Sequence, residues 1–158
     1  SEKKLIEILN QEKKYNFKEM IGLINKIDSK TFFGESTAYK ASVSSGRFNT
    51  SDDYKLVRNI SRLYEHFFVR LDLNGNMLDK IVINFGDDFL SNFNKARFNQ
   101  TNIDTLELKN YFFSNDFHNA LLNVYDMQNN YYLKRLFETR NQLISIKDLL
   151  NNQRQILK

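Results

Sequence analysis

The chain has 158 residues, a length typical of one domain, and its 41% hydrophobic and 27% charged residues are usual for a folded protein rather than a disordered one. The absence of Cys excludes disulfides, thiol catalysis and thiolate metal sites, while the absence of Pro and the presence of only five Gly disfavour turn-rich sandwiches and barrels. The formal net charge of +4 is mild, and the 23 basic residues are not concentrated in one stretch, so a nucleic-acid-binding face is not expected.

The first predicted element is one amphipathic helix over residues 2–28. Its apolar residues recur at steps of three and four, and Lys, Glu and Asn lie on the opposite face, as in a helix that buries one side. The apolar positions are Leu5, Ile6, Leu9, Phe17, Met20, Ile21, Ile24 and Ile27.

A short helix is predicted between residues 35 and 46. Ser36 or Thr37 has a side chain suited to a helix N-cap, and Gly46 suits the residue just beyond a helix end. Tyr39 and Val43 are four residues apart, so we expect both to face the core.

Another long helix is predicted from the polar start at residues 50–53, with apolar residues at helical spacing as far as Phe93. The turn signal Asn74-Gly75-Asn76 leaves two alternatives. The helix is broken at Gly75, or residues 67–73 and 77–85 pair as a β-hairpin across Asn-Gly. We favour the broken helix, because neither flank alternates with a period of two.

Residues 95–108 show the weakest periodicity and are predicted to be a loop or short connector. A final helix is expected from residue 115 to residue 158, with Ser114 or Asn115 as its cap. Its stripe consists of Phe117, Leu121, Val124, Tyr125, Tyr132, Leu136, Thr139, Leu143, Ile146, Leu150 and Leu157. The sequence therefore predicts an all-α fold, an antiparallel helical bundle with three long helices plus one or two short helices, in a single domain over residues 1–158.

The titratable residues form no recognisable catalytic or metal-binding motif. His66 and His118 are the only histidines, and neither has a ligand-type partner three or four residues away. The acid pairs Asp52–Asp53 and Asp87–Asp88 each lie near an expected helix end, where carboxylates cap helices. We therefore expect no catalytic residue, no metal site and no cofactor, and a protein that is not an enzyme.

Adjacent aromatic residues occur at 32–33, 67–68, 112–113 and 131–132. One member of each pair is needed for the core of a chain without Trp, and this is the simpler explanation of the pairs. The other member is available to line a small-molecule pocket or a partner surface. The candidate ligand or partner surface consists of Tyr39, Phe67, Phe112 and Tyr131.

Several segments resemble a known family. Residues 37–46 read Thr-Ala-Tyr-Lys-Ala-Ser-Val-Ser-Ser-Gly, and residues 56–65 form a stretch ending Leu-Tyr-Glu. The stretch 114–122, Ser-Asn-Asp-Phe-His-Asn-Ala-Leu-Leu, runs into Asn130-Tyr-Tyr132 and a long amphipathic tail. This pattern resembles an uncharacterised family of small membrane-anchored proteins widespread in Bacteroidota, over roughly residues 15–155.

The resemblance implies a basic N-terminal segment and one membrane span, with the helical domain beyond it on the periplasmic side. It implies no catalytic residues. No stretch of this chain approaches the roughly 18 consecutive apolar residues that a span needs. Because the chain begins at Ser1 rather than Met, we expect a processed or trimmed product whose anchor precedes Ser1.

Three functional hypotheses follow. The first is a non-enzymatic extracytoplasmic helical interaction or sensor domain of a membrane-anchored bacterial protein, which binds a protein partner or a small-molecule ligand. The second is the ligand-sensing domain of a two-span receptor or histidine kinase, with another span after Lys158. The third, from a different class, is a soluble cytoplasmic accessory protein that binds nucleic acid or a phage component, which predicts salt-sensitive binding.

Overall fold

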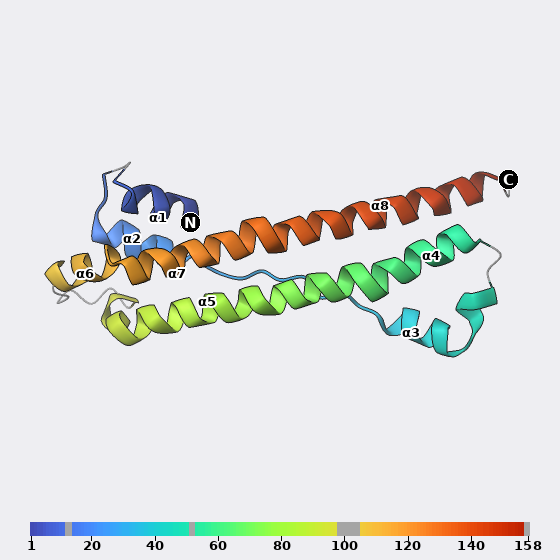
Figure 1. Ribbon diagram of the computed structural model, residues 1–158, viewed down its shortest axis with the longest axis horizontal. Helices are drawn as coiled ribbons and strands as arrows, with labels where there is room; N and C mark the ends of the chain where they lie inside the picture. Colours follow the sequence, from blue (N-terminus) through green and yellow to red (C-terminus); the bar gives the residue numbers. More distant parts are fainter. Residues whose placement is uncertain (12–13, 51–52, 98–104, 157–158) are drawn as a thin grey trace. The chain divides into compact units, whose positions relative to one another are not determined.

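The computed structural model describes residues 1–11, 14–50, 53–97 and 105–156, and every regular element in these ranges is a helix (Figure 1). The all-α helical bundle is therefore confirmed. A 3₁₀ turn, η1 (Arg47–Thr50), and two π-helical segments, η2 (Leu63–Phe67) and η3 (Met127–Tyr132), accompany the α-helices. The α-helices are α1 (Glu2–Leu9), α2 (Phe17–Ile24), α3 (Thr37–Ser44), α4 (Tyr54–Arg62), α5 (Phe68–Arg97), α6 (Thr105–Phe112), α7 (Asn115–Asp126) and α8 (Leu133–Ile156).

The chain divides into two compact units, each of which combines two segments that are distant in sequence. Unit 1 comprises residues 1–30 and 77–130, and unit 2 comprises residues 31–76 and 131–158. The boundaries fall inside α5 and η3, so these helical segments contribute residues to both units. The single domain over residues 1–158 stays a prediction from the sequence.

The core of unit 1 is a cluster of aromatic and aliphatic side chains. In this unit α1 packs against α2 and α7, and α6 packs against α7. Phe112 is fully buried, and its ring centroid lies 6.2 Å from that of Phe89 and 5.3 Å from that of Phe117. The buried members of the cluster are Leu5, Ile8, Leu9, Met20, Ile24, Phe85, Phe89, Phe93, Leu108, Phe112, Phe117, Leu121 and Val124.

Tyr111 lies against this core, and its hydroxyl donates a 2.7 Å hydrogen bond to Asp88 Oδ2. Burial and, secondly, the bond to the Asp88 carboxylate raise the pKa of Tyr111 well above its ordinary value of 10.0. The folded chain therefore keeps this proton at pH values where the unfolded chain loses it. The resulting stability is fully present below about pH 10 and is lost as the pH rises further.

We expect Tyr111→Phe to make the free energy of unfolding less sensitive to alkaline pH, because phenylalanine has no proton to retain. The measurement is the decrease in Tm between about pH 9 and pH 11, which should be smaller for the variant than for the wild type. Tyr54→Phe is the matched control, because Tyr54 is 85% exposed, and it should behave as the wild type does. Equal decreases for Tyr111→Phe and the wild type would contradict the expectation.

In unit 2, α4 and η2 pack antiparallel against α8 (Figure 1). Gln142 of α8 is buried, and its Nε2 donates to the backbone oxygen of Asn59 at 2.9 Å and to Asn59 Oδ1 at 3.0 Å. Further along α8, the Gln153 side chain donates to the Asp53 carboxylate, before the start of α4. These polar contacts fix the register of the helix pair, because a shift would leave a buried amide unpaired.

The segment that precedes α3 is also tied to unit 2. The Tyr132 hydroxyl accepts a 2.6 Å hydrogen bond from the backbone N–H of Phe32. Gly75 of α5 is buried beside the same segment, where an added Cβ would lie 3.4 Å from the side chain of Thr31. The chain from residue 31 therefore follows the long helices closely before α3 begins.

The predicted single helix over residues 2–28 is wrong. α1 ends at Leu9, and Gln11 adopts a φ of +60°, which an α-helix does not accommodate. α2 begins only after its N-cap Asn16, whose side chain accepts a 2.8 Å hydrogen bond from Glu19 N. Both halves keep helical spacing, so the apolar pattern does not reveal the break. α1 and α2 are therefore two short helices where the sequence predicts one long helix.

Both alternatives at Gly75 are also wrong. α5 passes through Gly75 as helix and continues to Arg97 with a kink at Phe93, so residues 67–73 and 77–85 form no hairpin. The predicted connector at 95–108 is helical at both of its ends, because α6 begins at Thr105, while residues 98–104 lie outside the described ranges. Gly75 serves close packing instead of a turn.

The predicted helix caps have mixed outcomes. Asp53 caps α4 as expected, since its Oδ1 accepts a 2.9 Å hydrogen bond from Leu56 N, while Asp52 lies outside the described residues. Ser114 caps α7, because its hydroxyl accepts from the backbone N–H of Phe117. Asp87–Asp88 lie inside α5 and cap no helix, so that prediction is wrong.

The final helix is confirmed as a long helical run, and most of its predicted stripe is buried, namely Phe117, Leu121, Val124, Tyr132, Thr139 and Ile146. Leu143 and Leu150 are exposed, whereas Gln142 is buried and Leu149 is half-buried. The helical run is not a regular α-helix throughout, because η3 is a π-helical segment. The predicted stripe assumed an unbroken α-helix through this point. Leu157 lies outside the described residues.

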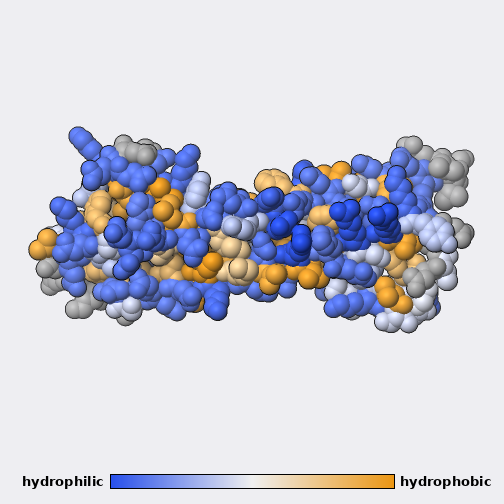
Figure 2. Space-filling model, viewed as in Figure 1, coloured by the Kyte–Doolittle hydropathy of each residue, from blue (hydrophilic) through white to orange (hydrophobic). Residues whose placement is uncertain are grey.

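The visible surface is mostly hydrophilic, with hydrophobic residues in small groups between hydrophilic ones (Figure 2). Within the described ranges, the helices lack a stretch with the length and apolarity needed to cross a membrane.

Candidate functional site

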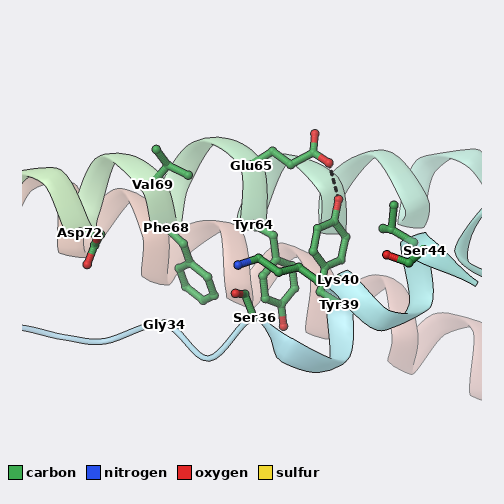
Figure 3. A pocket seen from close by; sticks show the side chains of 11 residues that line it. Gly34, Ser36, Tyr39, Lys40, Ser44, Tyr64, Glu65, Phe68, Val69 and Asp72 are labelled. Atoms are coloured by element: carbon green, nitrogen blue, oxygen red, sulfur yellow. Dashed lines mark hydrogen bonds between the residues drawn. The ribbon is translucent and has the colours of Figure 1, made fainter.

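A hollow in unit 2 lies between α3 and the helix formed by η2 and the start of α5 (Figure 3). It has a volume of about 680 Å³, compared with about 160 Å³ for a hollow in unit 1 beside α2 and α5. It is lined by Gly34, Ser36, Tyr39, Lys40, Val43, Ser44, Tyr64, Glu65, Phe68, Val69 and Asp72. Ligand pockets in proteins typically have volumes of roughly 300–1,000 Å³, so this hollow is the candidate site.

One wall of the hollow is the short helix α3, which forms where predicted. It begins after Ser36 and ends before Gly46, whose φ of +73° is the left-handed conformation that favours glycine. Tyr39 and Val43 were expected to face the core, but Tyr39 is half-buried, Val43 is exposed, and both line the hollow. The helix thus presents this face to the site.

Gly34 allows the chain ahead of α3 to approach the opposite wall. A Cβ at Gly34 would lie 2.9 Å from Phe68 Cδ2 and 3.0 Å from Phe68 Cγ, which is too close for a side chain to be accepted without a shift. Both atoms belong to the rigid ring of Phe68, close to its attachment to the backbone, so the ring cannot move aside easily to make room for that Cβ. Gly34 therefore keeps the Phe68 ring in its place at the floor of the hollow.

The aromatic rings of the site form a connected series. Tyr39 stacks on Tyr64 with a centroid distance of 4.4 Å and an interplanar angle of 3°, and Tyr64 meets Phe68 edge to face at 5.2 Å. The ring of Phe32 extends the series, because its centroid lies 5.7 Å from that of Phe68. Such contacts fix the orientation of each ring, so the hollow has a preformed aromatic wall.

Tyr64 and Glu65 belong to the π-helical segment η2, whereas Phe68, Val69 and Asp72 belong to α5. A π-helical turn is rare, and it is found frequently at functional sites because it redirects side chains. Here the π-helical turn carries Tyr64, whose ring stacks on Tyr39, and the carboxylate of Glu65, and both residues line the hollow.

The polar groups of the hollow differ in the hydrogen bonds and ion pairs that they form. The Tyr39 hydroxyl donates a 2.5 Å hydrogen bond to Glu65 Oε1, shown as a dashed line in Figure 3. Burial and, secondly, this bond to a carboxylate raise the pKa of Tyr39, so Tyr39 remains a neutral donor. Asp72 has only a long contact, 3.4 Å, from Asn76 Nδ2. In the part of the chain that the structure describes, Lys40 makes no ion pair.

Of the four residues predicted to form a ligand or partner surface, only Tyr39 lines the hollow. Phe67 lies under the Arg62 guanidinium, whose Cζ is 5.4 Å from the ring centroid, and it does not line the hollow. Tyr131 is exposed on η3 outside the hollow. Phe112 is buried in the core of unit 1 and forms no part of a surface.

Sequence reasoning did not identify the other lining residues. Tyr64 and Phe68 were assigned to the core stripe because their four-residue spacing suits a buried face. The available signal was a second face of the same helix, on which Glu65, Val69 and Asp72 follow one another at steps of four and three. No group of three or more His, Asp or Glu residues suited to a metal ion occurs within the described ranges.

The fold and the hollow define this molecule as an all-α helical protein with one hollow of ligand size described in unit 2. The chain belongs to the family of unknown function DUF6090, whose model matches residues 2–119. This match includes all residues that line the hollow. No curated protein and no solved structure matches the chain.

Proposed function

We propose that this chain is a non-enzymatic ligand-binding domain that acts as a sensor or interaction module of a membrane-anchored bacterial protein, on the periplasmic side. The observation that supports ligand binding is the 680 Å³ hollow of unit 2, with a stacked aromatic wall and a few polar groups at its edges. Preformed sites of this composition bind small molecules in many proteins. Membrane attachment is supported by the family resemblance described from the sequence.

Filling the hollow tests ligand binding. Ligand-observed NMR with a library of amino acids, short peptides, sugars, nucleotides and organic acids should detect binders of the wild type. Val69→Trp should abolish their binding, because Val69 lines the hollow and is 58% exposed, so a larger side chain occupies the site without entering the core.

Ile83→Trp is the matched control, because Ile83 is also on α5, is 59% exposed and lies outside the hollow. Its binding should equal that of the wild type. Ligands that bind Val69→Trp as well as the wild type would place the site elsewhere and contradict the proposal.

Cell fractionation tests the membrane-anchored role separately. The complete gene product, expressed in bacterial cells, should be recovered with the membranes, and protease added to spheroplasts should digest the helical domain. Recovery in the soluble cytoplasmic fraction would contradict this part of the proposal. A protein with two spans and a cytoplasmic kinase would instead match the receptor alternative.

A further inference from the structure

We propose that the hollow binds a small zwitterion with an apolar body, namely an apolar amino acid or short apolar peptide. Its carboxylate lies at Lys40 and Ser36, and its ammonium group lies at Glu65 and Asp72. This inference rests on the proposed ligand-binding role and specifies the class of ligand.

The carboxylate position follows from two side chains of the α3 wall. Ser36 and Lys40 are one helical turn apart, joined by the 3.0 Å hydrogen bond from Lys40 N to Ser36 O, and both line the hollow. In Figure 3 the ends of both side chains point from α3 into the hollow. An ammonium group and a hydroxyl together suit a carboxylate, which accepts several charge-assisted hydrogen bonds.

The ammonium position follows from the opposite wall. Glu65 of η2 and Asp72 of α5 both line the hollow from the wall opposite α3. Tyr39 bonds to Oε1 of Glu65, and the hydrogen bonds of the described residues leave Oε2 available. A bound ammonium group donates three hydrogen bonds, and two carboxylates can accept them.

The charges of the hollow are separated rather than paired. Lys40 forms no ion pair with Glu65 or Asp72 in the described part of the chain, although all three line the same hollow. A ligand with only a negative charge would leave the two carboxylates without a cationic partner in the hollow, and one with only a positive charge would leave Lys40 without an anionic partner there. A zwitterion satisfies both walls at once.

The aromatic wall defines the body of the ligand. Tyr64, Phe68, Val43 and Val69 give the hollow an apolar surface between its charged edges. Burial of an apolar group there contributes about 25 cal/mol per Å² removed from water. The volume of about 680 Å³ is in the range of drug-sized molecules, so it has room for a dipeptide as well as for a single amino acid.

Isothermal titration calorimetry of the complete chain with four matched probes tests whether the ligand is a zwitterion with an apolar body. The probes are the dipeptide L-leucyl-L-phenylalanine, its N-acetyl form without the ammonium charge, its C-terminal amide without the carboxylate charge, and free L-phenylalanine. We expect the zwitterionic dipeptide to bind about two- to fivefold more tightly than either blocked form, since Lys40, Glu65 and Asp72 are exposed and ion pairs of exposed side chains are weak. Tighter binding of L-phenylalanine than of the dipeptide would assign the site to free amino acids.

Charge-neutralising variants locate the two ends. Lys40→Gln should lower the affinity for the dipeptide and leave the affinity for its C-terminal amide unchanged. Asp72→Asn should lower the affinity for the dipeptide and leave the affinity for its N-acetyl form unchanged. The controls are Lys80→Gln and Asp87→Asn, which alter exposed residues of α5 outside the hollow. Circular dichroism melting of each variant establishes that it is folded.

Two results would overturn the inference. Equal affinity for the dipeptide and a blocked form would show that the hollow recognises only one of the two terminal charges. Absence of binding by all four probes at millimolar concentration would exclude the class. Sensitivity of other ligands to Val69→Trp would then show that the ligand-binding role stands while the zwitterion does not.

Discussion

Phe112→Ala is expected to lower the free energy of unfolding by about 3–5 kcal/mol, the usual cost of removing a buried phenylalanine ring. The side chain is fully buried in unit 1 and contacts aromatic rings from α2, α5 and α7, including those of Phe17, Phe89 and Phe117. Truncation removes all of these contacts and leaves a cavity where three helices meet. The surrounding rings cannot all move to fill it, because each is itself packed against others.

Thermal and urea denaturation measure this loss, which should lower Tm by roughly 6–20 °C for a chain of this length. Phe137→Ala is the matched control, since Phe137 of α8 is 60% exposed, and its truncation should change the free energy of unfolding by less than about 1 kcal/mol. If the two variants proved equally stable, Phe112 would not lie in the core as described.

The burial of Phe112 also shows what the aromatic pairs reveal and what they hide. Adjacent aromatic residues in a helix point about 100° apart, so at most one of each pair faces the centre of a core. This prediction holds for Tyr132 beside exposed Tyr131, but it is wrong for Phe32 and Phe33, which are both exposed. It does not say which member, and Phe112 rather than Phe113 is the fully buried one. The choice depends on the position of neighbouring helices.

The helical nature of the chain was predictable because apolar spacing, capping residues and the absence of Pro all favour helices. The interruptions were not predictable. The break after α1 depends on Gln11 in a positive φ, for which Gln has no preference, and on the Asn16 cap inside an otherwise helical pattern. The apolar spacing also gives no indication of the π-helical segments η2 and η3.

The site was only partly predictable for the same reason. The sequence identified Tyr39 as a candidate surface residue. Its stacking partner Tyr64 belongs to a π-helical turn that the sequence pattern did not predict. The hollow also depends on Gly34, whose close approach to Phe68 joins segments far apart in the chain. A single sequence records spacing along one helix and carries no direct record of such contacts.

Leu71→Ala should destabilise unit 2 by about 2–5 kcal/mol, whereas Leu73→Ala should change the free energy of unfolding by less than about 0.5 kcal/mol. The two residues are close neighbours in α5, but Leu71 is 1% exposed and Leu73 is 58% exposed. Because the same substitution is made in the same helix, the change in helix propensity is the same in both variants. The difference between them therefore measures burial alone.

Urea denaturation of both variants gives this difference, and hydrogen exchange locates it. In Leu71→Ala the amides of α4 and α8 should exchange faster, because these helices form unit 2 with the first part of α5. In Leu73→Ala they should exchange at the wild-type rate. A large effect at Leu73 with none at Leu71 would mean that α5 is rotated relative to the packing described for unit 2, and Phe68, Val69 and Asp72 would then not face the hollow together.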